Sequence, residues 1–111
     1  MASVKYDYAE MIWYEIKEAA EQDRVALLPV ATYEDHGPHL PVDVDGVLTT
    51  EIWRRAAARI PDEVVLVPPV GHGYSPHHMD FHGTITIRWI RSSIMLKMSV
   101  AAWRIMDLSG Y

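Results

Sequence analysis

Carboxylates and imidazoles crowd the polar segment Glu34–Asp45. Its twelve residues contain Glu34 and three aspartates, together with His36 and His39. Carboxylate oxygen and imidazole nitrogen are the ligands that zinc, manganese and iron use in hydrolases. Glu34 and His36 are two residues apart, so in an extended chain their side chains point the same way and can share one ion. A Gly-Pro bend can return Asp45 to the same place, and the segment therefore predicts a divalent-metal site.

Each of these residues also has a simpler interpretation. Asp45 stands just before a predicted helix and can cap it. His39 can be a buried structural histidine bonded to a backbone carbonyl, and Glu34 can be a solvated surface charge. Residues 43–46 resemble the opening of a calcium loop, but the later ligands and the closing glutamate are absent. The density of the mixture directly after a strand favours a metal site over these alternatives.

Three predicted helices and two or three predicted strands must position this segment. Apolar residues at helical spacing predict helices over about residues 6–22, 47–60 and 87–108. Continuous apolar runs predict buried parallel strands over residues 25–31 and 63–67, and residues 84–87 are expected to form a short strand. Pro29 favours a strand edge or end, because proline donates no ladder hydrogen bond. The acidic segment thus follows the first strand of a right-handed βαβ unit, where α/β sheets bind ligands.

The composition excludes several classes of protein. The chain has 111 residues, half of them hydrophobic, and no linker, which predicts one domain over residues 1–111. Its net charge of −5 argues against a nucleic-acid binder and against a basic membrane-surface helix. The absence of cysteine excludes disulfide scaffolds and thiolate chemistry. No signal peptide and no membrane span is visible, so a cytoplasmic protein without membrane or nucleic-acid partners is expected.

Two segments of the sequence match known motifs. The run from Leu28 to Asp45 contains Glu-x-His-Gly-x-His-Leu-Pro and then an aspartate after three further residues. It resembles the signature of the creatininase (creatinine amidohydrolase) family at all seven specified positions. The run from Gly73 to Ile85 is similar to the family's Gly-x-Ser-x-Glu-His-x-x-Phe-Pro-Gly-Thr segment. The two matches stand in the right order and span most of the chain.

The resemblance implies a fold and an activity. Members of this family are metal-dependent hydrolases that cut C–N bonds of cyclic and linear amides, including creatinine and formamide precursors of cofactors. Their fold is a three-layer α/β/α sandwich with a mostly parallel sheet, and many form hexamers. We therefore expect an α/β chain that is an incomplete half of such a domain, because family members continue beyond the third helix.

The resemblance also implies roles for individual residues. Two divalent ions, of zinc, manganese or iron, would be bridged by Asp45. Glu34 would bind one ion and His36 the other, with His39 supporting the ligands or serving a structural role. Substrate would lie beside two residues of the second segment, Ser75 and His78.

The chain departs from the family pattern in two ways. His77 stands where glutamate is common, and His82 stands where proline is common. These imidazoles can be ligands, substrate contacts or neutral changes, and neither is expected to be catalytic. In addition, the family's later Asn-Gly-His strand, a further glutamate ligand and a catalytic histidine have no counterpart here. Three ligands for two ions leave both ions under-coordinated, unless other groups complete the site.

Two functions remain open from the sequence. The first is a metal-dependent amidohydrolase acting on a small-molecule amide, whose remaining ligands come from another polypeptide, either a complementary chain or another copy. The second is a non-catalytic truncated relative that acts as an assembly or regulatory subunit. An unpaired sheet edge and an apolar third helix carrying Trp89 and Trp103 motivate the second. A metal-carrying protein, a third idea, rests only on the six histidines between His36 and His82.

Overall fold

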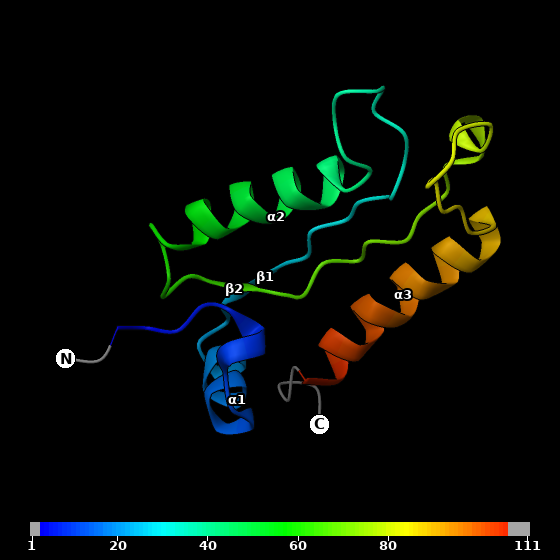
Figure 1. Ribbon diagram of the computed structural model, residues 1–111. Coiled ribbons are helices and arrows are strands. Elements are labelled where there is room, and N and C mark those ends of the chain that lie inside the picture. Colours follow the sequence, from blue (N-terminus) through cyan, green and yellow to red (C-terminus); the bar gives the residue numbers. More distant parts are fainter. Residues whose placement is uncertain (1–2, 107–111) are drawn as a thin grey trace.

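The chain folds as a small parallel sheet between helices (Figure 1). The computed structural model describes residues 3–106, and side chains of residues 3–98. On one side of the strands lies α2, and on the other lie α1 and α3 (Figure 1). This arrangement confirms the expected α/β class with a parallel sheet. The elements in chain order are η1 (Tyr8–Glu10), α1 (Trp13–Glu21), β1 (Val25–Leu27), α2 (Val44–Ala57), β2 (Val64–Leu66), η2 (Pro76–His78) and α3 (Trp89–Met106).

Two chain segments run parallel well beyond the formal strands. β1 and β2 pair with Val25 opposite Val64. Further along, Val67 N donates to Leu27 O at 2.9 Å, and Ala31 N donates to Val70 O at 2.9 Å. Because the two segments run in the same direction, the loops that follow them emerge at the same end of the sheet. This pairing brings the two sequence motifs together.

The core is small and centres on β2. Ala57 of α2 packs on Val64 and Leu66, with Tyr6 and Leu27 at the edge of the cluster. All three residues of β2 are buried, as predicted. The prediction of a buried first strand is wrong.

The exposure of β1 has a structural cause. The first residue of this strand, Val25, is 60% exposed. In the part of the chain that the structure describes, β1 pairs only with β2 and its other edge has no strand beside it. The strand also ends before the fully buried Pro29, as the missing N–H of proline requires.

The first helix starts later than predicted. Asp7 Oδ1 accepts a hydrogen bond from Ala9 N, so a 3₁₀ turn replaces the expected first helical turn. The backbone is then extended at Ile12, whose N–H donates to Glu15 Oε2 and begins α1. The helix ends before Asp23, which has a left-handed φ of 55°. Local capping by acidic side chains therefore overrides the apolar periodicity.

The other boundaries lie closer to expectation. α2 begins at Val44, so Asp45 lies inside its first turn and is not the cap, which is Asp43. Residues 84–87 form isolated bridges and no regular strand. Their neighbours come from two different loops, which prevents a continuous ladder. α3 starts at Trp89. The predicted end at Leu108 and the side chain of Trp103 lie outside the described residues.

The molecule exposes much more surface than a compact chain of its mass. Its accessible area is 8070 Å², whereas about 6200 Å² is typical for this mass. The radius of gyration is 16.2 Å, against about 13 Å for a compact domain of this length. Large apolar side chains contribute to this surface on several elements: Val25, Leu48, Ile52, Trp89, Ile90, Ile94 and Met98. These dimensions match a partial domain. No helix among the described residues could cross a bilayer.

One arginine connects the sheet to its surroundings. Arg24 Nη2 donates hydrogen bonds to the carbonyl oxygens of Lys5, Pro61 and Val64. These carbonyls belong to the N-terminal segment, the turn after α2 and β2. Since the two bonds to Pro61 and Val64 are partly buried, the guanidinium satisfies acceptors that water reaches poorly.

We predict that Arg24→Ala lowers the free energy of unfolding by about 1–3 kcal/mol, because partly buried carbonyls lose their donor. Urea titration followed by tryptophan fluorescence measures the change. Arg59→Ala, which removes an exposed arginine of the same charge, is the control and should change stability little. Equal stability of the two variants would contradict the role of Arg24.

Candidate metal centre

Three side chains predicted to bind metal meet at the end of the sheet. Glu34 and His36 follow β1, and Asp45 reaches the same place from the first turn of α2. One potential ligand atom from each lies within 4.8 Å of the others. All three side chains are only partly exposed. The predicted return of Asp45 to Glu34 and His36 is therefore what the structure shows.

His36 is oriented by two contacts. Its Nδ1 lies 3.0 Å from the carbonyl oxygen of Glu34, and its Nε2 lies 3.2 Å from Asp45 Oδ1. The carbonyl of Glu34, and secondarily the charge of Asp45, raises the pKa of His36 above its ordinary value. A backbone partner on Nδ1 leaves Nε2 as the nitrogen that can accept a cation when the ring is neutral.

Two hydroxyl groups hold Glu34. Its Oε2 accepts hydrogen bonds from Thr32 Oγ1, at 3.0 Å, and from Ser75 Oγ. The Ser75 hydroxyl, and after it that of Thr32, holds the pKa of Glu34 below its ordinary value and outweighs the opposing effect of partial burial. Glu34 is therefore ionised near neutral pH, as a metal ligand must be.

Thr32 is a site residue that the motifs did not indicate. Its hydroxyl lies 3.3 Å from Asp45 Oδ2 as well as beside Glu34, so it links two of the proposed ligands. A Cβ built on Gly73 would come within 2.5 Å of Thr32 Cγ2, which shows how closely the second loop approaches. The sequence contains one signal for Thr32. Thr32, Glu34 and His36 are spaced by two, so in an extended chain their side chains point to the same side.

Residues 84–87 form hydrogen bonds to both loops, the one that follows β1 and the one that contains Ser75. Thr84 Oγ1 accepts from Asp35 N at 3.2 Å, and Thr86 Oγ1 accepts from Ser75 N at 2.8 Å. The backbone adds two further bonds, from Ile85 N to Tyr33 O and from Ile87 N to Gly73 O, both 2.9 Å. This segment therefore fixes the first loop against the second.

The remaining residues singled out in the sequence divide into two sets. Ser75 is fully buried, and its hydroxyl donates to Glu34. His78 Nε2 lies 4.0 Å from Glu34 Oε1, and His77 lies beside it. His39 and His82 are exposed and belong to neither group of possible metal ligands found among the described residues. The supporting role of His39 and the substrate contacts of Ser75 and His78 stay predictions.

A groove lies along α2, apart from these donors. This groove of about 690 Å³ is lined by residues of α2 and of the turn before the second loop, among them Tyr33, Arg54 and His72. None of the grouped carboxylate and imidazole donors lines it. The chemistry of the molecule is therefore assigned to the donors at the strand ends, not to this groove.

The donor set fits a divalent cation. Two carboxylates and a neutral imidazole attract a positive ion, and the donor types suit zinc, manganese and iron alike. Asp45 lies in the first turn of α2, so a helix start positions this carboxylate beside the other two donors. The fit concerns the metal class and does not distinguish among these metals.

Comparison with known proteins finds relatives among hydrolases. The chain is 33% identical over 97 residues to the mycofactocin precursor peptide peptidase of Mycobacterium ulcerans, covering 77% of this chain and 39% of that protein. It is 39% identical over 67 residues to the creatinine amidohydrolase of Pseudomonas putida, covering 59% and 25%. The 3-dehydro-scyllo-inosose hydrolase of Thermotoga maritima is 29% identical over 82 residues, covering 73% and 26%. The chain thus spans about two fifths of the length of the first of these relatives.

Solved structures agree with this relationship. A crystal structure of creatinine amidohydrolase (creatininase) superposes with a TM-score of 0.85 at 26% identity, covering 95% of this chain and 42% of that one. A creatininase described as the Mn form superposes with a TM-score of 0.67 at 31% identity, covering 76% and 34%. A mutant creatininase is described as the Zn-Zn type.

The family relationship covers nearly all of the described chain. The family model described as creatinine amidohydrolase matches residues 9–102, a range that includes every donor at the strand ends. The structural match extends over the sheet and its helices, so the resemblance seen in the two motifs is confirmed along the chain. The chain therefore belongs to the creatininase family of hydrolases.

Proposed function

We propose that the chain contributes to a metal-dependent hydrolase that cleaves a C–N bond of a cyclic or linear amide. The observation that carries this proposal is the meeting of Glu34, His36 and Asp45 within 4.8 Å, inside the motif that the chain shares with its family. Family membership supports a hydrolase, and the donor chemistry supports metal assistance.

Each donor has a place in this proposal. Glu34 would hold one ion, His36 a second, and Asp45 would contact both. An ion bound there supplies Lewis acidity, which polarises a carbonyl and makes water reactive near neutral pH. Thr32 keeps Glu34 and Asp45 aligned through its hydroxyl. The structures of manganese and zinc forms of creatininase support these two metals first.

The second loop would receive the substrate. His78 lies partly exposed next to Glu34, so an amide beside the metal donors would contact it. Ser75 keeps Glu34 ionised through its hydroxyl and is fully buried, so a direct contact with an amide would require the second loop to uncover it. The substrate is therefore a small molecule that binds across the two loops.

We also propose that the remaining ligands come from another polypeptide, either a complementary chain or another copy. The chain spans 42% of a solved creatininase with the same fold. The excess surface and the exposed apolar side chains support a covering partner.

A non-catalytic assembly or regulatory role is the second candidate. The apolar surface of α3 favours it, since Trp89 is 60% exposed and Met98 is 67% exposed. An apolar helix face that covers a partner requires no metal. Metal analysis separates the candidates, because only the hydrolase needs a bound ion.

We predict that His36→Ala and Asp45→Ala remove metal from the purified protein and, in the completed assembly, reduce amide hydrolysis at least about a hundredfold. His36 supplies the imidazole donor and Asp45 the shared carboxylate. Elemental analysis after desalting measures the bound ion, and His39→Ala is the control because His39 is exposed and lies outside the donor groups. Undiminished metal content in Asp45→Ala would refute the proposal.

We predict that zinc binding strengthens with pH, because a proton on His36 competes with the ion. The raised pKa of His36 moves this competition above the ordinary histidine range, with about a tenfold loss of affinity per pH unit below that pKa. In metal-free protein the sign is opposite: the contacts that raise the pKa of His36, the Glu34 carbonyl first, contribute stability that is present below the ordinary histidine pKa and lost as pH rises through the raised pKa.

NMR titration of the imidazole in metal-free protein tests this prediction. Asp45→Asn should lower the pKa of His36 only part of the way, since the carbonyl of Glu34 remains the larger cause. An unchanged titration in Asp45→Asn would show that the pair seen in the structure does not form in solution.

We predict that the isolated chain self-associates through its apolar surface. Size-exclusion chromatography with light scattering should give a mass above 12.7 kDa, and Trp89→Glu should lower it. Arg88→Glu, at the exposed neighbouring residue, is the control for added negative charge. A stable 12.7 kDa monomer would contradict assembly from copies and leave only a complementary chain.

A further inference from the structure

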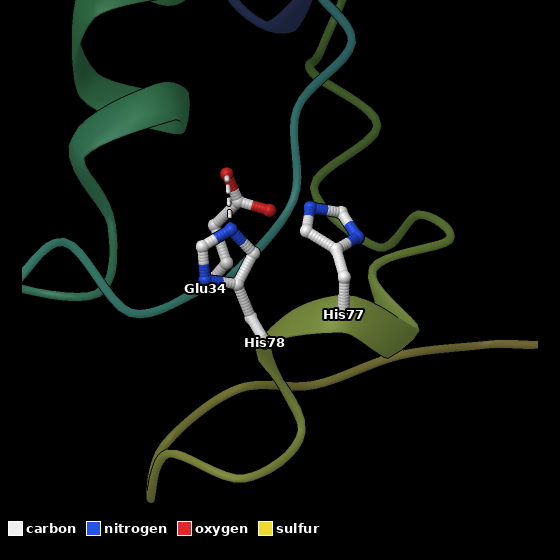
Figure 2. Close-up of side chains that lie close together, drawn as sticks. All are labelled: Glu34, His77 and His78. Atoms are coloured by element: carbon white, nitrogen blue, oxygen red, sulfur yellow. Dashed lines mark ion pairs between the residues drawn. The ribbon is translucent and has the colours of Figure 1, made fainter.

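A second group of possible metal ligands also contains Glu34. One potential ligand atom from each of Glu34, His77 and His78 lies within 4.8 Å of the others. Figure 2 shows the two imidazoles rising side by side from η2 toward the carboxylate. Their ring centroids are 4.3 Å apart, with an angle of 56° between the planes. One short 3₁₀ turn therefore presents two nitrogen donors to one carboxylate.

The distances suit an ion better than a direct contact. His78 Nε2 and Glu34 Oε1 are 4.0 Å apart, which is too far for a hydrogen bond. Two ligands on one tetrahedral zinc ion lie about 3.4 Å apart, given bonds of about 2.1 Å. A small rotation of side chains that are partly or fully exposed would close that difference. Two imidazoles and one carboxylate are also the protein ligands of a known class of zinc site.

His78 has an unexplained environment. Its Nδ1 is buried and has no hydrogen-bond partner among the described residues. Its Nε2 meets Glu34 Oε1 only at ion-pair distance, 4.0 Å, and makes no hydrogen bond to this carboxylate. No hydrogen bond to Glu34 therefore orients the ring, and a cation between Nε2 and Oε1 would fix it.

Glu34 can serve both groups at once. Its Oε2 accepts from the hydroxyls of Thr32 and Ser75, whereas Oε1 faces His78. The hydroxyl contacts hold the carboxylate in one orientation and keep it charged. The same fixed side chain therefore belongs to both groups, with His36 and Asp45 in one and the two histidines of η2 in the other.

We propose that His77 and His78 complete the ligand shell of the ion that Glu34 holds, so that this chain alone carries donors for two ions. The inference rests on the proposed function through Glu34, which both groups share. It gives His77, which stands where relatives often have glutamate, the role of a metal ligand. The under-coordination expected from three ligands is then relieved within the chain.

The test is a zinc titration of the metal-free 111-residue chain, followed by elemental analysis after desalting. Wild type should bind two zinc ions, and the double variant His77→Ala/His78→Ala should bind one. His82→Ala removes an exposed histidine of the same loop outside both groups, and should still bind two. The single variant His77→Ala alters only an exposed side chain, so its loss of one ion would not be a folding defect.

The outcomes separate this inference from the proposed function. If the double variant keeps the wild-type stoichiometry while His36→Ala loses an ion, the inference is wrong and the first metal group stands. If His36→Ala keeps both ions while the double variant loses one, the second group holds and the proposed function fails. Cobalt substitution adds a spectroscopic check, since a second set of visible bands should vanish with both histidines. Bands that are unchanged in the double variant would overturn the inference.

Discussion

The parallel pairing of residues 25–31 with residues 64–70 is the interaction on which the rest of the structure depends. It places the ends of two extended segments side by side, so that two loops distant in sequence share one location. Residues 84–87 then bond to both loops and hold them together. Without this pairing, Glu34 and Ser75 would have no reason to meet. The chemistry therefore follows from the direction of two short strands.

The sequence alone was enough to predict that Glu34, His36 and Asp45 meet, because spacing by two and a helix start are local features. It also predicted the parallel sheet and the three helices. It did not predict the late start of α1, where the side chain of Asp7 competes with the helix backbone. Nor did it predict the exposure of β1, which depends on what covers an edge. The bond from Ser75 to Glu34 joins residues 41 positions apart, and no local pattern reveals such a contact.

The electrostatics of the strand ends are arranged around one ionised carboxylate. Hydroxyl donors keep Glu34 charged without a compensating cation of the protein, because neither lysine nor arginine is among its hydrogen-bond and ion-pair partners in the described residues. Imidazoles approach it from two loops, His36 from the first and the pair His77 and His78 from the second. A negative charge held in this way suits the binding of a positive ion. The close approach of Gly73 to Thr32 preserves this geometry, since a larger side chain would push the two loops apart.

The outer edge of β1 affects how the chain associates after it is synthesised. Unpaired amide and carbonyl groups next to the exposed Val25 form a template for any extended segment that arrives first. A correct neighbour would complete the sheet, whereas a wrong one would start an aggregate or a domain swap. Timing thus matters as much as affinity, because the first extended segment to reach that edge occupies it.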